Sequence, residues 1–338
     1  MSTDRRSVFT LPKAHLHAHL IPSARPETMR ELAERYDVDL SDAWTFSNLS
    51  EFVVRSVIAF QLIRTPDDLA RLCREFVEDE ATQGVAYTEP MIGVYFFARQ
   101  FGLSPEEIFA IQDEAMRAAT AATGVQVGYM FGILRHDSPG DAEAIARFAA
   151  ERADRGVVAL GIAGDESIGS LATFRRAFEI AREAGLLVVP HAGESVGPES
   201  VREALDVLKP DRIAHGVRAV EDAEVLRRLA DEGVTCDVCP TSNVKLGVCS
   251  EIAAHQLPAM LEAGVPLTIN ADDQLFFGPK VAEEYELVRQ AFALTDEQLA
   301  EIARTSARAS GGPDGTIAKL LDSIDAWLAT APELDTEP

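Results

Sequence analysis

The chain has 338 residues, of which 47% are hydrophobic and 25% charged, a composition typical of a globular protein with a sizeable core. Its 31 basic and 55 acidic residues give a formal charge of −24, so we expect neither nucleic acid nor an anionic membrane as a partner. The sequence contains no long apolar run, and its first residues lack the apolar segment of a signal peptide. We therefore expect a cytoplasmic protein, and four sparse cysteines fit a reducing compartment.

The predicted elements begin with a strand over residues 13–18. A long insertion over about 21–84 follows, and within it 25–36 and 49–84 have helical spacing. From residue 85 onward strands and helices alternate, and Ser104-Pro-Glu-Glu is typical of a helix N-terminus. The eight predicted strands are 13–18, 85–89, 125–131, 157–162, 186–190, 212–214, 234–238 and 266–270.

Eight apolar strands that alternate with helices predict an α/β fold, specifically a (β/α)8 TIM barrel. The insertion at 21–84 is predicted to be a helical lid between strands one and two, because long connections on enzymes often cover the active site. No linker or repeat divides the chain, so we expect a single hydrolase domain over 1–338, with extra C-terminal helices. An open doubly wound sheet is the alternative, but its usual Gly-x-Gly-x-x-Gly turn is missing.

The first strand carries three histidines at alternate positions, His15, His17 and His19. Alternate residues of a strand point to one face, and three of only seven histidines in this arrangement indicate function. Neutral imidazole is a common ligand of zinc, so at least two of the three are predicted to bind a metal. We expect His15, which lies deepest, to stand behind the ligands or in the core.

Further polar residues follow the other predicted strands, and chemistry in such barrels occurs where strands end. His17, His19, His191 and Asp272 would supply three nitrogens and one carboxylate, and would leave one position open for water. A bound metal lowers the pKa of such a water to about 7. The sequence therefore predicts metal-assisted hydrolysis.

The other residues at these strand ends suit proton transfer and substrate binding. His215 and Asp272 are expected to take the proton of the attacking water and orient it, and Glu194 to donate a proton to the atom that gains electron density. Asp273 beside Asp272 is predicted to contact the substrate, because two adjacent carboxylates repel unless one is protonated or accepts a donor. Gly164 would let its backbone amide approach a flat ligand.

Taken together, six motifs resemble the adenosine deaminase family of the amidohydrolase superfamily, in the order of that family and over residues 11 to about 320. The motifs are His17-Ala-His19, Gly161-Ile-Ala-Gly-Asp-Glu166, His191-Ala-Gly-Glu194, Arg212-Ile-Ala-His-Gly216, Cys239-Pro-Thr-Ser-Asn243 and Asn270-Ala-Asp-Asp273. The resemblance implies hydrolytic deamination of a small-molecule purine nucleoside, such as adenosine or a 5′-modified adenosine like aminodeoxyfutalosine.

The resemblance also implies roles for individual residues. It implies one Zn²⁺ per chain, held by His17, His19, His191 and Asp272, with His19 also next to the substrate. It places Glu194 at purine N1 as proton donor, His215 beside the attacking water, Asp273 at N7 and the Gly164 amide at N3.

Three positions depart from the family pattern. Leu20-Ile21-Pro22 replaces Leu-Asp-Gly, whose aspartate lies near the ribose 5′-hydroxyl, so we expect adenosine to gain little over 5′-deoxy analogues. Gln274 stands for a usual proline after the two aspartates, and His15 for a usual glutamate.

Other interpretations remain open. The chain could be an amidohydrolase of the same superfamily that acts on another amide, lactone or amino-heterocycle, a deaminase of free adenine, or an inactive binding protein. Cys236 and Cys239 have the spacing of half a zinc motif, but we predict buried thiols on a strand, because no second cysteine pair exists. The sequence leaves the oligomeric state open.

Overall fold

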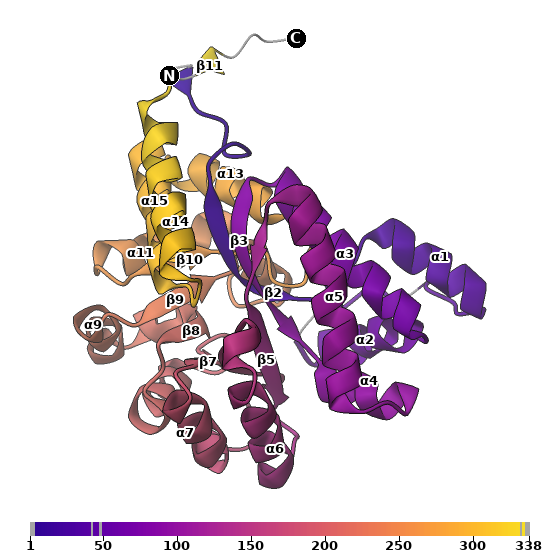
Figure 1. Cartoon of the computed structure of the whole chain (residues 1–338). Coiled ribbons are helices and arrows are strands. Elements are labelled where there is room, and N and C mark those ends of the chain that lie inside the picture. The colour runs from indigo at the N-terminus through magenta and orange to yellow at the C-terminus, as the bar shows by residue number, and fades with distance from the viewer. Residues whose placement is uncertain (1–3, 42, 47–48, 332, 335–338) are drawn as a thin grey trace.

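The computed structural model describes residues 4–41, 43–46, 49–331 and 333–334. Eight parallel strands follow one another around the molecule, with helices outside them (Figure 1). This nearly closed arrangement confirms the predicted (β/α)8 barrel. The strands are β2 (Lys13–His19), β3 (Val85–Ile92), β5 (Tyr129–Leu134), β6 (Val157–Ala163), β7 (Leu187–Ala192), β8 (Arg212–His215), β9 (Thr235–Val238) and β10 (Leu267–Ile269).

The barrel closes between its first and last strands, β2 and β10. The backbone of Ala18 bridges Asp272 there, and the Asp272 amide donates to the carbonyl of His17 at 3.2 Å. The side-chain oxygen of Asn270 accepts from the amides of Leu16 and His17, at 2.9 and 3.1 Å. His17 and His19 lie on the β2 side of this seam and Asp272 follows β10 on the other side, so the way the seam closes sets the distance between these predicted metal ligands.

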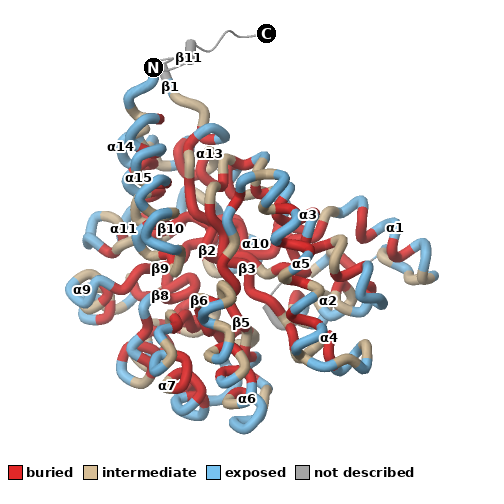
Figure 2. The backbone as a smooth tube through the Cα atoms, viewed as in Figure 1, coloured by how far each residue is buried: buried red, intermediate tan, exposed pale blue. Residues whose placement is uncertain are grey.

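Helices surround the strands, with buried residues toward the barrel and exposed ones outside (Figure 2). None of the helices in the described ranges is both long and apolar enough to cross a membrane. The helices after β3 are α4 (Val94–Phe101), α5 (Pro105–Thr123), α6 (Pro139–Ala150), α7 (Arg175–Glu183), α8 (Pro198–Glu203), α9 (Ala223–Glu232), α10 (Pro240–Lys245), α11 (Leu257–Glu262), α12 (Gln274–Phe277), α13 (Val281–Phe292), α14 (Asp296–Ala309) and α15 (Asp314–Ala329).

The insertion between β2 and β3 contains α1 (Pro26–Tyr36), α2 (Leu49–Leu62) and α3 (Pro66–Thr82), while its residues 42, 47 and 48 lie outside the described residues. In Figure 1 these helices gather with α4 on one side of the barrel. The prediction of one helical segment over 49–84 is wrong, because Thr65 caps the start of α3 and a proline follows it. A lid function for the insertion stays a prediction.

Two other elements differ from the sequence prediction. The strand expected over 125–131 is divided into β4 (Gln126–Val127) and β5, and a side chain at Gly128 between them would meet the Tyr87 hydroxyl at 2.2 Å. Helix α4 was not predicted. The predicted start of α5 is confirmed, since Ser104 accepts from the amide of Glu107 and Pro105 begins the helix.

Paired charges fill the barrel interior away from the rim. The Arg212 guanidinium, fully buried, donates to Glu89 at 2.7 Å and to Asp237 at 2.9 Å. Thr268 donates to the second oxygen of Asp237 at 2.7 Å. Burying three charges away from water costs free energy, and these contacts offset that cost.

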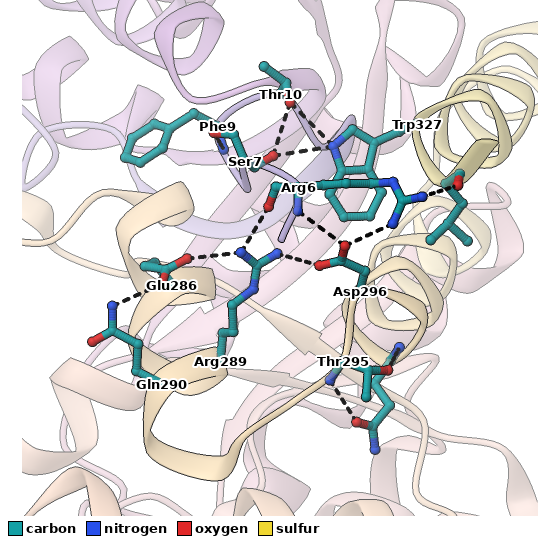
Figure 3. Close-up of polar contacts among 12 residues, drawn as sticks. Arg6, Ser7, Phe9, Thr10, Glu286, Arg289, Gln290, Thr295, Asp296 and Trp327 are labelled. Atoms are coloured by element: carbon teal, nitrogen blue, oxygen red, sulfur yellow. Dashed lines mark hydrogen bonds and ion pairs between the residues drawn. The ribbon is translucent and has the colours of Figure 1, made fainter. Parts of the chain in front are cut away.

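The chain ends meet at one end of the molecule, where a two-stranded sheet joins β1 (Asp4–Arg5) to β11 (Glu333–Leu334). Arg6 beside it donates to Asp296 at 2.9 Å and to the carbonyl of Thr330 just beyond α15 (Figure 3). Arg289 donates to the other Asp296 oxygen at 2.9 Å and to the Arg6 carbonyl at 2.8 Å. The N-terminal segment is thus fastened to the C-terminal helices.

Candidate active site

Every predicted site residue lies where a barrel strand ends, on a single rim of the barrel. His17 and His19 belong to the end of β2, and Asp272 with Asp273 follows β10. The others are Gly164 just after β6, His191 in β7, Glu194 two residues beyond β7 and His215 at the end of β8.

The predicted metal ligands converge. Donor atoms of His17, His19 and His191 lie within 4.8 Å of one another, and Nε2 of both His17 and His19 is 3.5 Å from Asp272 Oδ1. His191 Nδ1 donates to the Ile162 carbonyl at 2.8 Å, which leaves its Nε2 free to bind a metal. Both ring nitrogens of His17 are buried without a hydrogen-bond partner, and coordination of a metal would satisfy one of them. Three imidazoles and one carboxylate therefore fit Zn²⁺.

Burial keeps most of these imidazoles neutral, the state that binds metals. It lowers the pKa of His19 to about 4 and that of His215 to about 3. Burial, the largest single cause, acts to lower the pKa of His17, but the charge and hydrogen bond of Asp272 together with those of Asp237 outweigh it, so the net pKa is raised. For Asp272 burial acts to raise the pKa, and the neighbouring histidines, His17 foremost, lower it overall.

Glu194 has the opposite electrostatics. Burial, and then the charges of Asp272 and Glu166, raise its pKa well above the ordinary range, which favours the protonated form of its carboxyl. Its Oε1 lies 3.4 Å from His215 Nε2, which is also 3.8 Å from Asp272 Oδ2. A proton donor and a proton acceptor therefore face the same small volume.

A chain of side chains behind His215 fixes its tautomer. Asn243 Nδ2 donates to His215 Nδ1 at 3.3 Å, His255 Nε2 donates to Asn243 Oδ1 at 3.1 Å, and the Leu257 amide donates to His255 Nδ1 at 3.0 Å. The proton of His215 is therefore on Nε2, directed at Glu194 and Asp272. Asn243 belongs to a motif noted in the sequence without a role, and His255 was missed because it lies in a loop far from any strand end.

Glu166, which the sequence left undecided, holds the turn that carries Glu194. Its carboxylate accepts from the amides of Gly193 at 3.1 Å, Glu194 at 2.9 Å and Val196 at 3.3 Å. Arg135, also missed, donates to the His191 carbonyl at 3.0 Å. Both residues act on the backbone of the β7 end.

The backbone itself is strained at two of the central residues. His215 and Asp272 have φ values of 68° and 57°, in the left-handed region that side chains other than glycine rarely adopt. Such strain concentrates at functional sites, where surrounding contacts hold the residue in place. Gly164, with φ of 101°, adopts a conformation that only glycine takes readily.

Asp273 is poised to meet a ligand. Burial, followed by the charges of Asp272 and Glu194, raises its pKa well above the ordinary range, and its Oδ1 is buried without a partner. The predicted buried thiols are present: Cys236 and Cys239 are free cysteines, and Cys239 Sγ lies within 4.8 Å of donor atoms of His17 and Asp272.

A buried apolar side chain stands at the position where the family pattern has its aspartate. Ile21 is only 2% exposed, and the neighbouring Pro22 carbonyl accepts from the Leu275 amide at 2.8 Å. Aromatic rings of the insertion pack against those of α12. The Phe52 and Phe276 centroids are 5.2 Å apart, and the Trp44 and Phe276 centroids are 5.0 Å apart.

Comparison with known proteins agrees with this geometry. The sequence profile of the adenosine deaminase family matches residues 12–327. The chain belongs to the adenosine deaminase family. A putative adenosine/adenine deaminase of Streptomyces virginiae is 44% identical over 334 residues, which cover 96% of this chain and 98% of that protein. The family resemblance seen in the sequence is confirmed, and the protein is a deaminase-type hydrolase.

Two solved structures of relatives share the fold of this family member. Adenine deaminase from Arthrobacter aurescens is 29% identical, with a TM-score of 0.86 over 94% of this chain and 99% of that chain. An amidohydrolase from Burkholderia ambifaria with bound Zn is 26% identical, with a TM-score of 0.84 over 96% of this chain and 94% of that chain.

Proposed function

We propose that this protein hydrolyses the 6-amino group of an adenine ring and releases ammonia, with one Zn²⁺ held by His17, His19, His191 and Asp272. The observation that carries the proposal is that these donor atoms converge on the rim where the buried Glu194 carboxyl lies 3.4 Å from His215. When bound, Zn²⁺ supplies a water whose pKa is lowered to about 7. The zinc in the Burkholderia ambifaria relative supports this choice of metal.

The chain's own residues would move the protons. Asp272 would accept the proton of the water, and His215, whose Nε2 carries a proton, would help to orient the water while its oxygen bonds to C6. Glu194 donates its proton to ring N1, which gains electron density as C6 is attacked. The proton that Asp272 took from the water would then pass to the amino nitrogen, which leaves C6 as ammonia. The remaining hydroxyl would return a proton to Glu194 and leave the 6-oxopurine. Asp273 would bind N7 and the Gly164 amide N3, with His19 beside the ring.

Two kinds of adenine compound suit this chemistry, a nucleoside such as adenosine or a 5′-modified adenosine, and free adenine. A 5′-hydroxyl that met Ile21 would be buried without a partner, at a cost of about 1–3 kcal/mol or roughly 5- to 150-fold in affinity. An apolar Ile21 at this position therefore favours free adenine, or a nucleoside that lacks the 5′-hydroxyl. The adenine deaminase of Arthrobacter aurescens supports the first of these.

Ammonia release from adenine, adenosine and 5′-deoxyadenosine tests the proposal. We expect adenine or 5′-deoxyadenosine to match or exceed adenosine in kcat/KM. A preference for adenosine over 5′-deoxyadenosine above about 100-fold would contradict the role of Ile21. Ile21→Asp should shift the preference toward adenosine, with Ile21→Val as the matched control. No ammonia from any adenine compound would refute the reaction itself.

A further inference from the structure

His15 is a buried histidine of β2 that the proposed reaction does not use. Its Nδ1 lies 2.8 Å from Glu80 Oε2 on α3, and its Nε2 accepts from the Ala271 amide at 3.1 Å. A backbone amide can only donate, so Nε2 must be unprotonated and the proton must lie on Nδ1, where Glu80 accepts it. Both contacts therefore specify one neutral tautomer.

The amide that His15 holds belongs to the residue before Asp272. Asp272 keeps a strained backbone with φ of 57°, and such a conformation persists only where surrounding contacts fix it. Two other contacts act on the same residue: its amide donates to the His17 carbonyl at 3.2 Å, and its carbonyl accepts from the Ser23 hydroxyl at 3.2 Å. The His15 contact links this segment to helix α3 of the insertion, through Glu80.

We propose that His15 is a positioning residue, whose Nε2 holds the Ala271 amide and thereby sets the direction of the Asp272 carboxylate across the seam between β2 and β10. The inference rests on the proposed role of Asp272 as a metal ligand and proton acceptor. The imidazole is oriented in turn by Glu80, a carboxylate of the insertion. The insertion is thus coupled to the metal site through this ring as well as through Ser23.

Two substitutions separate the two contacts of His15. In His15→Gln the amide oxygen reaches the place of Nε2 and can accept from Ala271, whereas the contact with Glu80 is lost. In His15→Asn the shorter side chain can still donate to Glu80 from the place of Nδ1 but cannot reach Ala271. Each variant loses one buried hydrogen bond, so both should melt below the wild type.

The measurements are Zn²⁺ affinity, by competition with a chelator, melting temperature and deamination kinetics of the zinc-loaded protein. We expect His15→Asn to bind Zn²⁺ about 10- to 100-fold more weakly and to lose kcat, while His15→Gln stays within about threefold of the wild type in both. Equal losses in the two variants, or a normal Zn²⁺ affinity in His15→Asn, would overturn the proposal and leave His15 with a packing role. Absence of deamination in the wild type would refute the proposed function alone, because the affinity comparison needs no turnover.

Discussion

Glu194 and Asp272 share one buried site, but their pKa values are shifted in opposite directions. Asp272 faces His17 and His19, which lower its pKa and keep it ionised. Glu194 faces no cation in the described site, and burial raises its pKa. Two carboxyl groups of different protonation provide an acid and a base in one place, which hydrolysis of a carbon–nitrogen bond requires.

At the scale of single residues, we predict that Glu194→Gln loses turnover but keeps its metal. An amide has no acidic proton to give, and a positioned proton donor is commonly worth 10²–10⁴-fold, so kcat should fall by about that factor. Steady-state kinetics and metal analysis of the purified variant measure both quantities. Glu199→Gln, which changes a nearby exposed glutamate, is the control. Turnover within about tenfold of the wild type would exclude Glu194 as the donor.

The sequence predicted those site residues that follow a strand, because strand ends are recognisable and parallel strands bring them to one rim. His17, His191 and Asp272 were found in this way. Asn243, His255 and Arg135 were assigned no role, since their functions depend on contacts with residues far away in the sequence or on a loop conformation. Only the folded chain shows that His255 reaches Asn243.

At the scale of elements, a buried carboxyl joins α13 to α10. Glu284 is buried and accepts from the Thr241 amide at 3.2 Å. Burial, the largest cause, raises its pKa to about 8, although the bonds from Thr241 act to lower it. The carboxyl is therefore protonated at neutral pH, and two helices pack around a neutral group.

This protonation predicts a pH-dependent stability. The pKa of Glu284 is higher in the folded chain than in the unfolded one, so the folded state binds more protons between about pH 4.5 and 8. Its contribution to stability is present below that window and is lost as the pH rises through it. We expect the free energy of unfolding to fall less between pH 5 and 8 in Glu284→Gln than in the wild type. Chemical denaturation across that range measures it, with the exposed Glu34→Gln as control. If the free energy of unfolding changed equally with pH in the wild type and in Glu284→Gln, this account would be contradicted.

Element types were predictable, but their interruptions were not. The alternation of apolar strands and helices predicted the barrel, because the periodicity of each strand or helix can be recognised from residues that are close together in the sequence. The break at Thr65 and the division at Gly128 arise from a cap and a close approach to Tyr87. Apolar periodicity continues through both positions and therefore hides them.

At the scale of the whole molecule, the two chain ends stabilise each other. The Arg6 guanidinium lies 5.7 Å from the Trp327 ring and bonds to Asp296 and to carbonyls at the end of α15 (Figure 3). A cation at a helix C-terminus also interacts favourably with the helix dipole. This cluster lies among the terminal segments and α13 to α15, away from the rim that carries the site.

We therefore predict that Arg6→Met lowers stability without changing catalysis. Loss of charge-assisted hydrogen bonds at a largely buried site should cost about 1–3 kcal/mol, and the melting temperature should fall by several degrees. Arg5→Met, at the neighbouring exposed arginine, is the matched control and should have little effect. If Arg6→Met had the same melting temperature as the wild type, the chain ends would have to be held by other contacts.

The central claim is that one metal centre on this rim deaminates an adenine compound. The most direct measurement is titration of the metal-free protein with Zn²⁺ while ammonia release from the best adenine substrate is followed. The account predicts negligible activity without metal and a linear rise that ends at about one Zn²⁺ per chain, the number that three histidines and Asp272 can hold. Full activity in the metal-free protein, or a rise that ends only at two metals per chain, would contradict it.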